Sequence, residues 1–191
     1  ATKVFSSGEG GAITTNSDEL ADKLRLMRNF GFLQKDNVIK IGTNGKMSEF
    51  SAAYGLVHLD EIDSIIHYNK LIHATYLQVF SKFNEISFLN YDFEGKSNYQ
   101  YVVARVCSRI RDSLVEYFYR EGILLRRYFH PGCHNMEPYK STEKYKSLKL
   151  PITEKISSEI VIFPTGKQLT KEDVKHFAKL FERFITLNSI N

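Results

Sequence analysis

The stretch that decides the fold is the start of the chain, Ala1-Thr2-Lys3-Val4-Phe5-Ser6-Ser7-Gly8-Glu9-Gly10-Gly11-Ala12. A lysine stands beside hydroxyl residues and is followed by a Gly-x-Gly-Gly turn, in which glycine lets the backbone turn tightly and approach neighbours closely. The next residues, 12–15, are apolar and β-prone, which predicts a short strand. On spacing alone, a solvated surface residue is the simpler interpretation of Lys3.

Three further motifs follow in a fixed order along the chain. They are Arg28-Asn29-Phe30-Gly31-Phe32, then Asn44-Gly45-Lys46-Met47-Ser48-Glu49 with Ala52-Ala53 behind it, then Arg126-Arg127-Tyr128-Phe129-His130-Pro131 with His134 and Pro138-Tyr139. With the opening Ala-Thr-Lys and Glu-Gly-Gly-Ala, this order resembles the C-terminal half of the nucleotide-sugar aminotransferases of the DegT/DnrJ/EryC1/StrS type. The resemblance covers essentially all 191 residues.

The resemblance implies a fold and a division of the chain. The fold class expected is α/β, the aspartate aminotransferase-like fold type I of enzymes that depend on pyridoxal 5'-phosphate. Residues 1–60 would complete the large cofactor-binding domain, and residues 61–191 would form the small C-terminal domain. The chain starts without Met and inside a motif, so we expect a fragment of a polypeptide about twice as long, beyond the usual size of one domain.

By resemblance, Lys3 is the lysine that bonds covalently to the aldehyde of pyridoxal 5'-phosphate. An amine attacks an aldehyde only when neutral, and lysine ordinarily titrates near pKa 10.4, so such a site must lower that value. The same amine then moves a proton between the amino-bearing carbon and the cofactor. The Glu9-Gly10-Gly11 turn is expected to be structural.

In the family, the motif matching Asn44 and Lys46 reaches across a homodimer to the phosphate of the partner's cofactor, so the active sites would be shared. An amide donor and an ammonium group both suit an anion. The alternative interpretations are a turn residue for Asn44 and a solvated charge for Lys46.

Tyr128, His130 and His134 lie in the segment that, by resemblance, faces the sugar nucleotide. Phenol and imidazole groups hydrogen-bond sugar hydroxyls and phosphates. The alternatives are that Tyr128 packs in the small domain and that His134 is an exposed loop residue. Arg126 and Arg127 would meet the diphosphate or remain surface charges.

The predicted reaction transfers an amino group from an amino acid donor, L-glutamate, to a dTDP-4-keto-6-deoxyhexose, in nucleotide-sugar biosynthesis for O-antigen or another surface polysaccharide. Two alternatives within the family are a C3 keto-sugar aminotransferase and a dehydratase, but a dehydratase commonly replaces the lysine by histidine. A third alternative is a non-catalytic dimerising module.

Composition narrows the class further. Hydrophobic residues make up 42% and charged residues 25%, and the net charge of +4 comes from interspersed residues, so we expect no nucleic-acid partner. No apolar run has membrane-spanning length, and no signal peptide is recognisable. The two cysteines and six histidines show no metal-binding spacing. We therefore expect a cytoplasmic enzyme without a metal.

Periodicity predicts the remaining elements. Helices are expected from residues 16–17 to Gly31, over 47–83, over 111–121 with a stop at Gly122, over 151–159, and after a capping box that begins at Thr170. Strands are expected near 37–41 and over 86–89, 99–106, 123–125 and 160–163. Residues 132–150 are expected to form a surface excursion with a short helix near 143–145.

Overall fold

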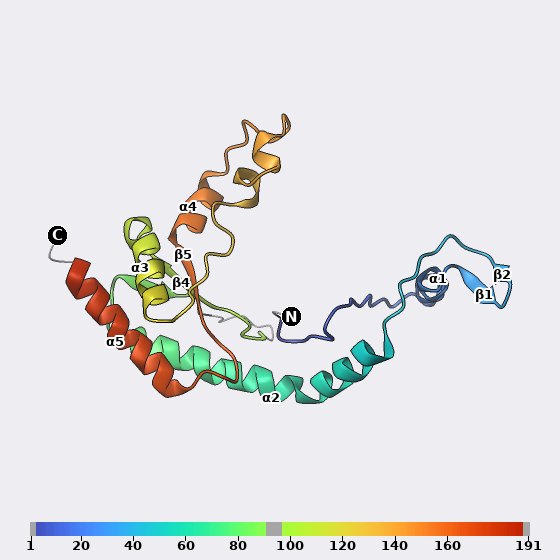
Figure 1. Cartoon of the computed structure of the whole chain (residues 1–191), viewed down its shortest axis with the longest axis horizontal. Coiled ribbons are helices and arrows are strands. Elements are labelled where there is room, and N and C mark those ends of the chain that lie inside the picture. Colours follow the sequence, from blue (N-terminus) through green and yellow to red (C-terminus); the bar gives the residue numbers. More distant parts are fainter. Residues whose placement is uncertain (1–2, 91–96, 189–191) are drawn as a thin grey trace. The chain divides into compact units, whose positions relative to one another are not determined.

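A computed structural model of the chain describes residues 3–90 and 97–188 (Figure 1). The chain divides into two compact units, Ala1–Asp63 and Ser64–Asn191, which are described separately below. Helix α2, Glu49–Phe80, contributes residues to both units. Among the described residues, no helix is both long and apolar enough to cross a bilayer.

The N-terminal unit contains helix α1, Asp18–Arg28, where a helix was predicted. Its start follows from Ser17, whose hydroxyl oxygen accepts a hydrogen bond from the Leu20 N–H at 3.2 Å and so satisfies one free donor of the first turn. Acidic residues occupy the first turn and basic residues the last, as the helix dipole favours.

The end of α1 is closed by the loop that carries the Asn-Gly-Lys motif. Gly31 and Gly42 are required there, because a Cβ on Gly42 would lie 2.4 Å from the Gly31 nitrogen. Three backbone N–H groups donate to the last carbonyl oxygens of the helix: Gly31 to Leu26 at 2.8 Å, Thr43 to Met27 at 2.9 Å, and Gly45 to Arg28 at 2.9 Å. The loop and the helix end therefore fix each other's conformation.

The two short strands of this unit are β1, Phe32–Gln34, and β2, Asn37–Val38, which pair antiparallel. The strand predicted at 37–41 is thus present only in its first two residues. The strand predicted over 12–15 is absent, and this prediction was wrong for the described chain. A strand exists only when its N–H and C=O groups are paired, and no described strand pairs with 12–15.

The C-terminal unit is built on an antiparallel sheet in the order β3-β4-β5. The strands are β3, Ile86–Phe88, β4, Val102–Val106, and β5, Ile160–Phe163, so the predicted 99–106 strand begins three residues late. Helices α3, Ser108–Arg120, α4, Pro151–Glu159, and α5, Lys171–Asn188, agree with the predicted positions.

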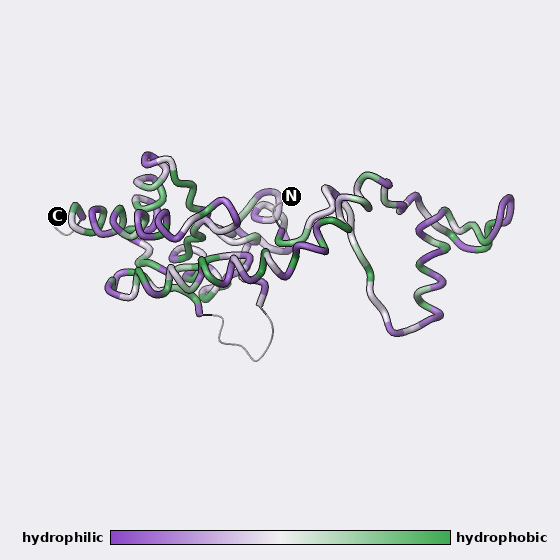
Figure 2. The backbone as a smooth tube through the Cα atoms, turned by 90° about the horizontal axis from the view of Figure 1, so that it is seen from below, coloured by the Kyte–Doolittle hydropathy of each residue, from purple (hydrophilic) through white to green (hydrophobic). Residues whose placement is uncertain are grey.

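The core of this unit lies between the sheet and helices α2, α3 and α5. Tyr76 of α2 is fully buried, and its ring contacts Phe163 of β5 and Phe177 of α5, with centroids 5.6 and 6.4 Å apart. Figure 2 shows apolar and polar residues alternating along α5, as expected for a helix with one face in the core. Burial of these aromatic residues stabilises the unit.

Two predictions for the C-terminal unit were wrong. Residues 123–125 form no strand, because the Ile123 N–H donates to the Phe118 carbonyl at 2.9 Å and closes α3 beside Gly122, whose φ is +78°. Only Arg126 pairs with the sheet, at Ile162. The excursion has no helix at 143–145; instead it has two 3₁₀ turns, Cys133–Asn135 and Tyr139–Ser141.

Candidate functional site

Lys3 lies on the wall of a pocket of about 810 Å³ in the N-terminal unit. Its side chain is exposed, and it approaches the pocket from the segment before the glycine turn. The other lining residues come from this segment and from the Met47 end of α2: Phe5, Ser6, Ser7, Gly8, Glu9, Gly10, Gly11, Ala12, Met47, Ala52, Gly55, Leu56 and Leu59. The wall is therefore mainly glycine backbone and small or apolar side chains.

The segment that carries Lys3 is tied to helix α2 through His58. The Ser6 backbone nitrogen and the Ser6 carbonyl oxygen each lie 2.9 Å from His58 Nδ1. The imidazole also stacks on Phe5, with ring centroids 5.7 Å apart. Ser6 itself is buried, and its hydroxyl oxygen accepts a hydrogen bond from the Gly8 N–H at 3.1 Å.

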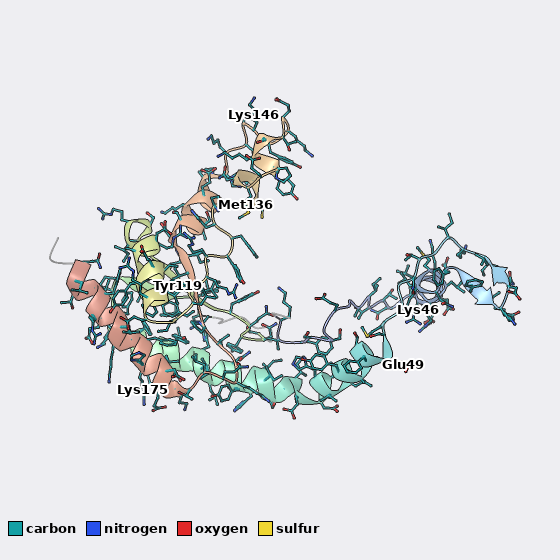
Figure 3. The ribbon with its side chains drawn as sticks, viewed as in Figure 1. Lys46, Glu49, Tyr119, Met136, Lys146 and Lys175 are labelled. Carbon is teal, nitrogen blue, oxygen red and sulfur yellow. The ribbon has the colours of Figure 1, made fainter. Side chains whose placement is uncertain are left out.

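Asn44 and Lys46 are exposed and lie on the loop that closes α1. Asn44 forms an antiparallel bridge with Asn29, and Lys46 places its ammonium group 5.0 Å from the centroid of the Phe30 ring. Figure 3 shows Lys46 shortly before Glu49, where α2 begins. Neither Asn44 nor Lys46 lines the Lys3 pocket, although Met47 does.

Tyr128 and His130 lie together in the C-terminal unit, in the segment after α3. Tyr128 is half-buried; its ring packs edge-on against Tyr101 at 5.9 Å, and the Arg126 guanidinium lies 5.6 Å from its centroid. His130 is also half-buried, and its Nδ1 has no hydrogen-bond partner among the described residues. A buried polar atom without a partner is costly unless a ligand or water satisfies it.

His134 is buried, contrary to the alternative that it is an exposed loop residue. Its Nε2 lies 3.2 Å from Glu154 Oε1 of α4 and 3.0 Å from Asn135 Nδ2. The pKa of the Glu154 carboxyl is held below its usual range, mainly by the hydrogen bond from the Leu150 N–H and then by the hydrogen bond with His134. His134 therefore ties the start of the excursion to α4 (Figure 3 labels Met136 and Lys146 along it).

A charged cluster of Arg111, Asp112 and Arg127 connects α3 to the segment that carries Tyr128 and His130. The Arg111 side chain is 2% exposed, and its Nε lies 2.7 Å from Asp112 Oδ1, while its Nη1 donates to the Ser157 carbonyl at 3.1 Å. Arg127 donates to the same Asp112 oxygen at 2.9 Å. These pairs lower the pKa of Asp112, although partial burial acts in the opposite direction.

The sequence predictions missed His58, Arg111 and Glu154. Arg111 was detectable, because it shares one face of α3 with Leu114 and Phe118, at helical spacing on the buried side. His58 had no comparable signal, since its partner is a backbone group 52 residues away. In the part of the chain that the structure describes, no group of three or more His, Cys, Asp or Glu side chains is arranged to hold a metal ion.

The chain belongs to the DegT/DnrJ/EryC1/StrS aminotransferase family, whose profile matches residues 1–182. It is 32% identical over 179 residues to dTDP-4-amino-4,6-dideoxy-D-glucose transaminase of Shigella dysenteriae, covering 92% of this chain and 48% of that protein. It is 28% identical over 177 residues to dTDP-3-amino-3,6-dideoxy-alpha-D-galactopyranose transaminase of Aneurinibacillus thermoaerophilus, covering 92% and 47%.

Solved structures show the same relationship. The crystal structure of DesI in the presence of its TDP-sugar product matches with a TM-score of 0.82 and 32% identity, over 98% of this chain and 50% of that one. The fold is therefore that of the C-terminal half of a fold type I aminotransferase, as the sequence motifs predicted. The chain spans about half the length of the relatives it matches.

The residues around Lys3 fit pyridoxal 5'-phosphate, the cofactor on which these fold type I enzymes depend. The amine that would bond to the aldehyde lines a pocket whose size is typical of small-molecule sites. At Gly10 the Met47 side chain lies close to the backbone, since a Cβ there would lie 2.9 Å from the Met47 methyl group.

Proposed function

We propose that the protein is a pyridoxal phosphate-dependent aminotransferase that moves an amino group from L-glutamate to a dTDP-4-keto-6-deoxyhexose. The products would be 2-oxoglutarate and a dTDP-4-amino-4,6-dideoxyhexose, so the exchange of amino and keto groups needs no external oxidant or reductant. The observation that carries the proposal is the Lys3 pocket, in a chain whose family is established by the match over residues 1–182.

Lys3 has two roles in this proposal. Its Nζ would bond to the aldehyde group of pyridoxal phosphate and so hold the cofactor in the pocket. Once released, Nζ would hold and move a proton at the amino-bearing carbon of the substrate. Bound pyridoxal phosphate supplies the conjugated ring that stabilises the negative charge left on that carbon.

Asn44 and Lys46 are proposed to serve the active site of a second subunit in a homodimer. Both are exposed and neither lines the Lys3 pocket of its own chain, which supports a role across an interface. The Asn44 amide would donate to the cofactor phosphate, and the Lys46 ammonium group would supply positive charge. The loop that presents them is held by its hydrogen bonds to the end of α1.

Tyr128, His130 and His134 are proposed to bind the sugar nucleotide. The Tyr128 ring and the unpartnered His130 Nδ1 would contact the ligand. His134 would hold their segment in place through Glu154. Because the family makes activated sugars, we place the enzyme in the cytoplasm, in O-antigen or related polysaccharide biosynthesis.

The test is to incubate the full-length enzyme, loaded with cofactor, with dTDP-4-keto-6-deoxyglucose and L-glutamate, and to locate the new amine by NMR. We expect an amine at C4. A C3 aminotransferase would leave this 4-keto sugar unchanged and would aminate dTDP-3-keto-6-deoxyglucose, supplied in parallel; that result would replace the assignment by the C3 alternative, which the relative named for a 3-amino sugar keeps relevant. No amine at all would contradict the proposal and favour a non-catalytic module.

Asn44 provides a second test of the shared site. Changing Asn44→Ala in the full-length enzyme removes one charge-assisted hydrogen bond to the phosphate, which corresponds to a loss of cofactor affinity of roughly ten- to a hundredfold. The measurement is a cofactor titration followed by visible absorbance. Asn37→Ala, in the β1–β2 hairpin of the same unit, is the matched control and is expected to leave the affinity unchanged. Equal affinities in the two variants would refute the role of Asn44.

A further inference from the structure

We propose that His58 is a positioning residue that clamps the backbone of the Lys3 segment onto helix α2 and so fixes the place of the Lys3 amine. This inference rests on the proposed function, because it gives Lys3 its catalytic role. It concerns a residue that the motifs of the family did not single out, and it depends on contacts within Ala1–Asp63 alone.

The clamp is a hydrogen bond between one imidazole nitrogen and the backbone of one residue. Nδ1 of His58 is 2.9 Å from both the nitrogen and the carbonyl oxygen of Ser6. Without a proton, Nδ1 accepts from the Ser6 N–H; with a proton, it donates to the Ser6 carbonyl. The imidazole therefore holds Ser6 in either neutral tautomer.

Packing around the ring reinforces this hydrogen bond. The His58 ring stacks on Phe5 at 5.7 Å and contacts Tyr54, one turn earlier in α2, at 5.9 Å. The segment lies close to the helix because residue 55 is glycine: a Cβ there would lie 3.3 Å from Ser7 Cβ. Larger side chains at position 55 would move the segment away from His58.

Ser6 is only three residues from Lys3, so its position limits where the lysine backbone can be, within roughly 10 Å. The residues that follow are also held, since Ser6 Oγ accepts from the Gly8 N–H and Ser7 Oγ donates to the Glu9 carbonyl. Residues 5–9 therefore form a local structure that is attached to the long helix through His58. A catalytic amine needs such support, because small displacements reduce the rate strongly.

The test compares four variants of the full-length enzyme. His58→Ala removes the hydrogen bond, and His58→Asn restores it, because the Asn side-chain amide lies near the position of Nδ1. His58→Gln has the same amide but places it near the position of Nε2. His67→Ala is the matched control, since His67 is an exposed histidine on the same helix.

Two readouts separate positioning from simple loss of folding. The first is amide hydrogen exchange over residues 4–8 of the cofactor-free protein, which we expect to be faster in His58→Ala and His58→Gln. The second is the cofactor concentration needed for half-maximal visible absorbance, which we expect to rise about two- to tenfold, equivalent to one protein hydrogen bond. His58→Asn and His67→Ala are expected to match the wild-type protein in both.

Two results would overturn the inference. One is that hydrogen exchange and cofactor affinity are unchanged in His58→Ala. The other is that His58→Asn and His58→Gln lose cofactor affinity equally, which would show that the position of the hydrogen-bonding group does not matter. Failure of the proposed function looks different, because the wild-type enzyme itself would then bind no cofactor through Lys3. The exchange measurement still tests the clamp in that case.

Discussion

Single polar residues inside the C-terminal unit have defined partners that explain their burial. Tyr76 donates its hydroxyl proton to the Pro164 carbonyl at 2.9 Å, and His73 Nε2 lies 3.0 Å from the Leu89 carbonyl. Both are on α2, and both tie the helix to a segment at the end of a strand. Each of these hydrogen bonds therefore fixes the register between the helix and the sheet.

Tyr76→Phe is expected to lower the free energy of unfolding by about 1 kcal/mol, because it leaves a buried carbonyl without its donor but keeps the ring. Burial, and then the charge of Asp173, raises the pKa of the Tyr76 hydroxyl, so it donates at all ordinary pH values. The control is Tyr119→Phe, whose side chain is 69% exposed (labelled in Figure 3). Equal effects in denaturant unfolding of the two variants would contradict the assignment.

His73 makes stability depend on pH. Burial lowers its pKa below the ordinary value of 6.5, and the hydrogen bond to the Leu89 carbonyl only partly offsets this. The unfolded chain then binds more protons, so the stabilising contribution is present above about pH 6.5 and is lost as pH falls through the folded-state pKa.

The measurement is the unfolding midpoint between pH 7.5 and 5 for the wild-type protein and His73→Gln, which keeps a donor for Leu89 but does not titrate. The wild-type midpoint is expected to fall further than that of the variant. Parallel pH profiles would show that His73 contributes nothing to the pH dependence.

At the scale of elements, α5 shows how a local pattern sets a boundary. Thr170 and Asp173 bind each other's backbone: the Asp173 N–H donates to Thr170 Oγ1 at 3.2 Å, and the Thr170 N–H donates to Asp173 Oδ2 at 2.7 Å. This is the predicted capping box, with aspartate in the position usually held by glutamate. Hydrogen bonds from Thr170 lower the pKa of Asp173.

Thr170→Ala is expected to destabilise the protein by about 1 kcal/mol, because the first turn of α5 loses its cap. Thr186→Ala, near the other end of the same helix, removes a hydroxyl that donates only to the Glu182 carbonyl one turn earlier, and should change stability by less than about 0.5 kcal/mol. Thermal unfolding of both variants provides the comparison. A larger loss in Thr186→Ala would refute the role of the cap.

The elements that could be predicted from sequence are those that depend on neighbours in the chain. Helices α1 and α5 have side-chain N-caps, and α3 ends beside Gly122; all three have periodic apolar residues within their own sequence and are found where expected. The predictions of strands at 12–15 and 123–125 were wrong because strand formation depends on partners that are distant in the chain. Residues 123–125 have strand-forming composition, but the closure of α3 uses their first N–H.

The candidate site residues also divide into those that a local motif marks and those whose partners are distant in the chain. Lys3, Asn44 and Tyr128 were recognisable from motifs. Arg111 was detectable from its place on the buried face of α3, but its partner and that of His58 were not. Those contacts join residues 52 and 46 positions apart in the chain, a separation that no local pattern encodes. The structure thus adds the contacts of His58 and Arg111 to the residues that the motifs had marked.

At the scale of the whole molecule, the N-terminal unit exposes many apolar side chains around the start of α2. Phe50 is 88% exposed, and Leu56 and Val57 are exposed as well. Large apolar patches of this kind usually mark interfaces.

A covalent bond between Lys3 and pyridoxal phosphate can be trapped by borohydride reduction of the full-length enzyme with its cofactor and located by peptide mass spectrometry. We expect a reduced pyridoxyl group on Lys3 in the wild-type enzyme and none at that position in Lys3→Ala. A label on another lysine, such as Lys46, or no label in the wild-type enzyme, would contradict it.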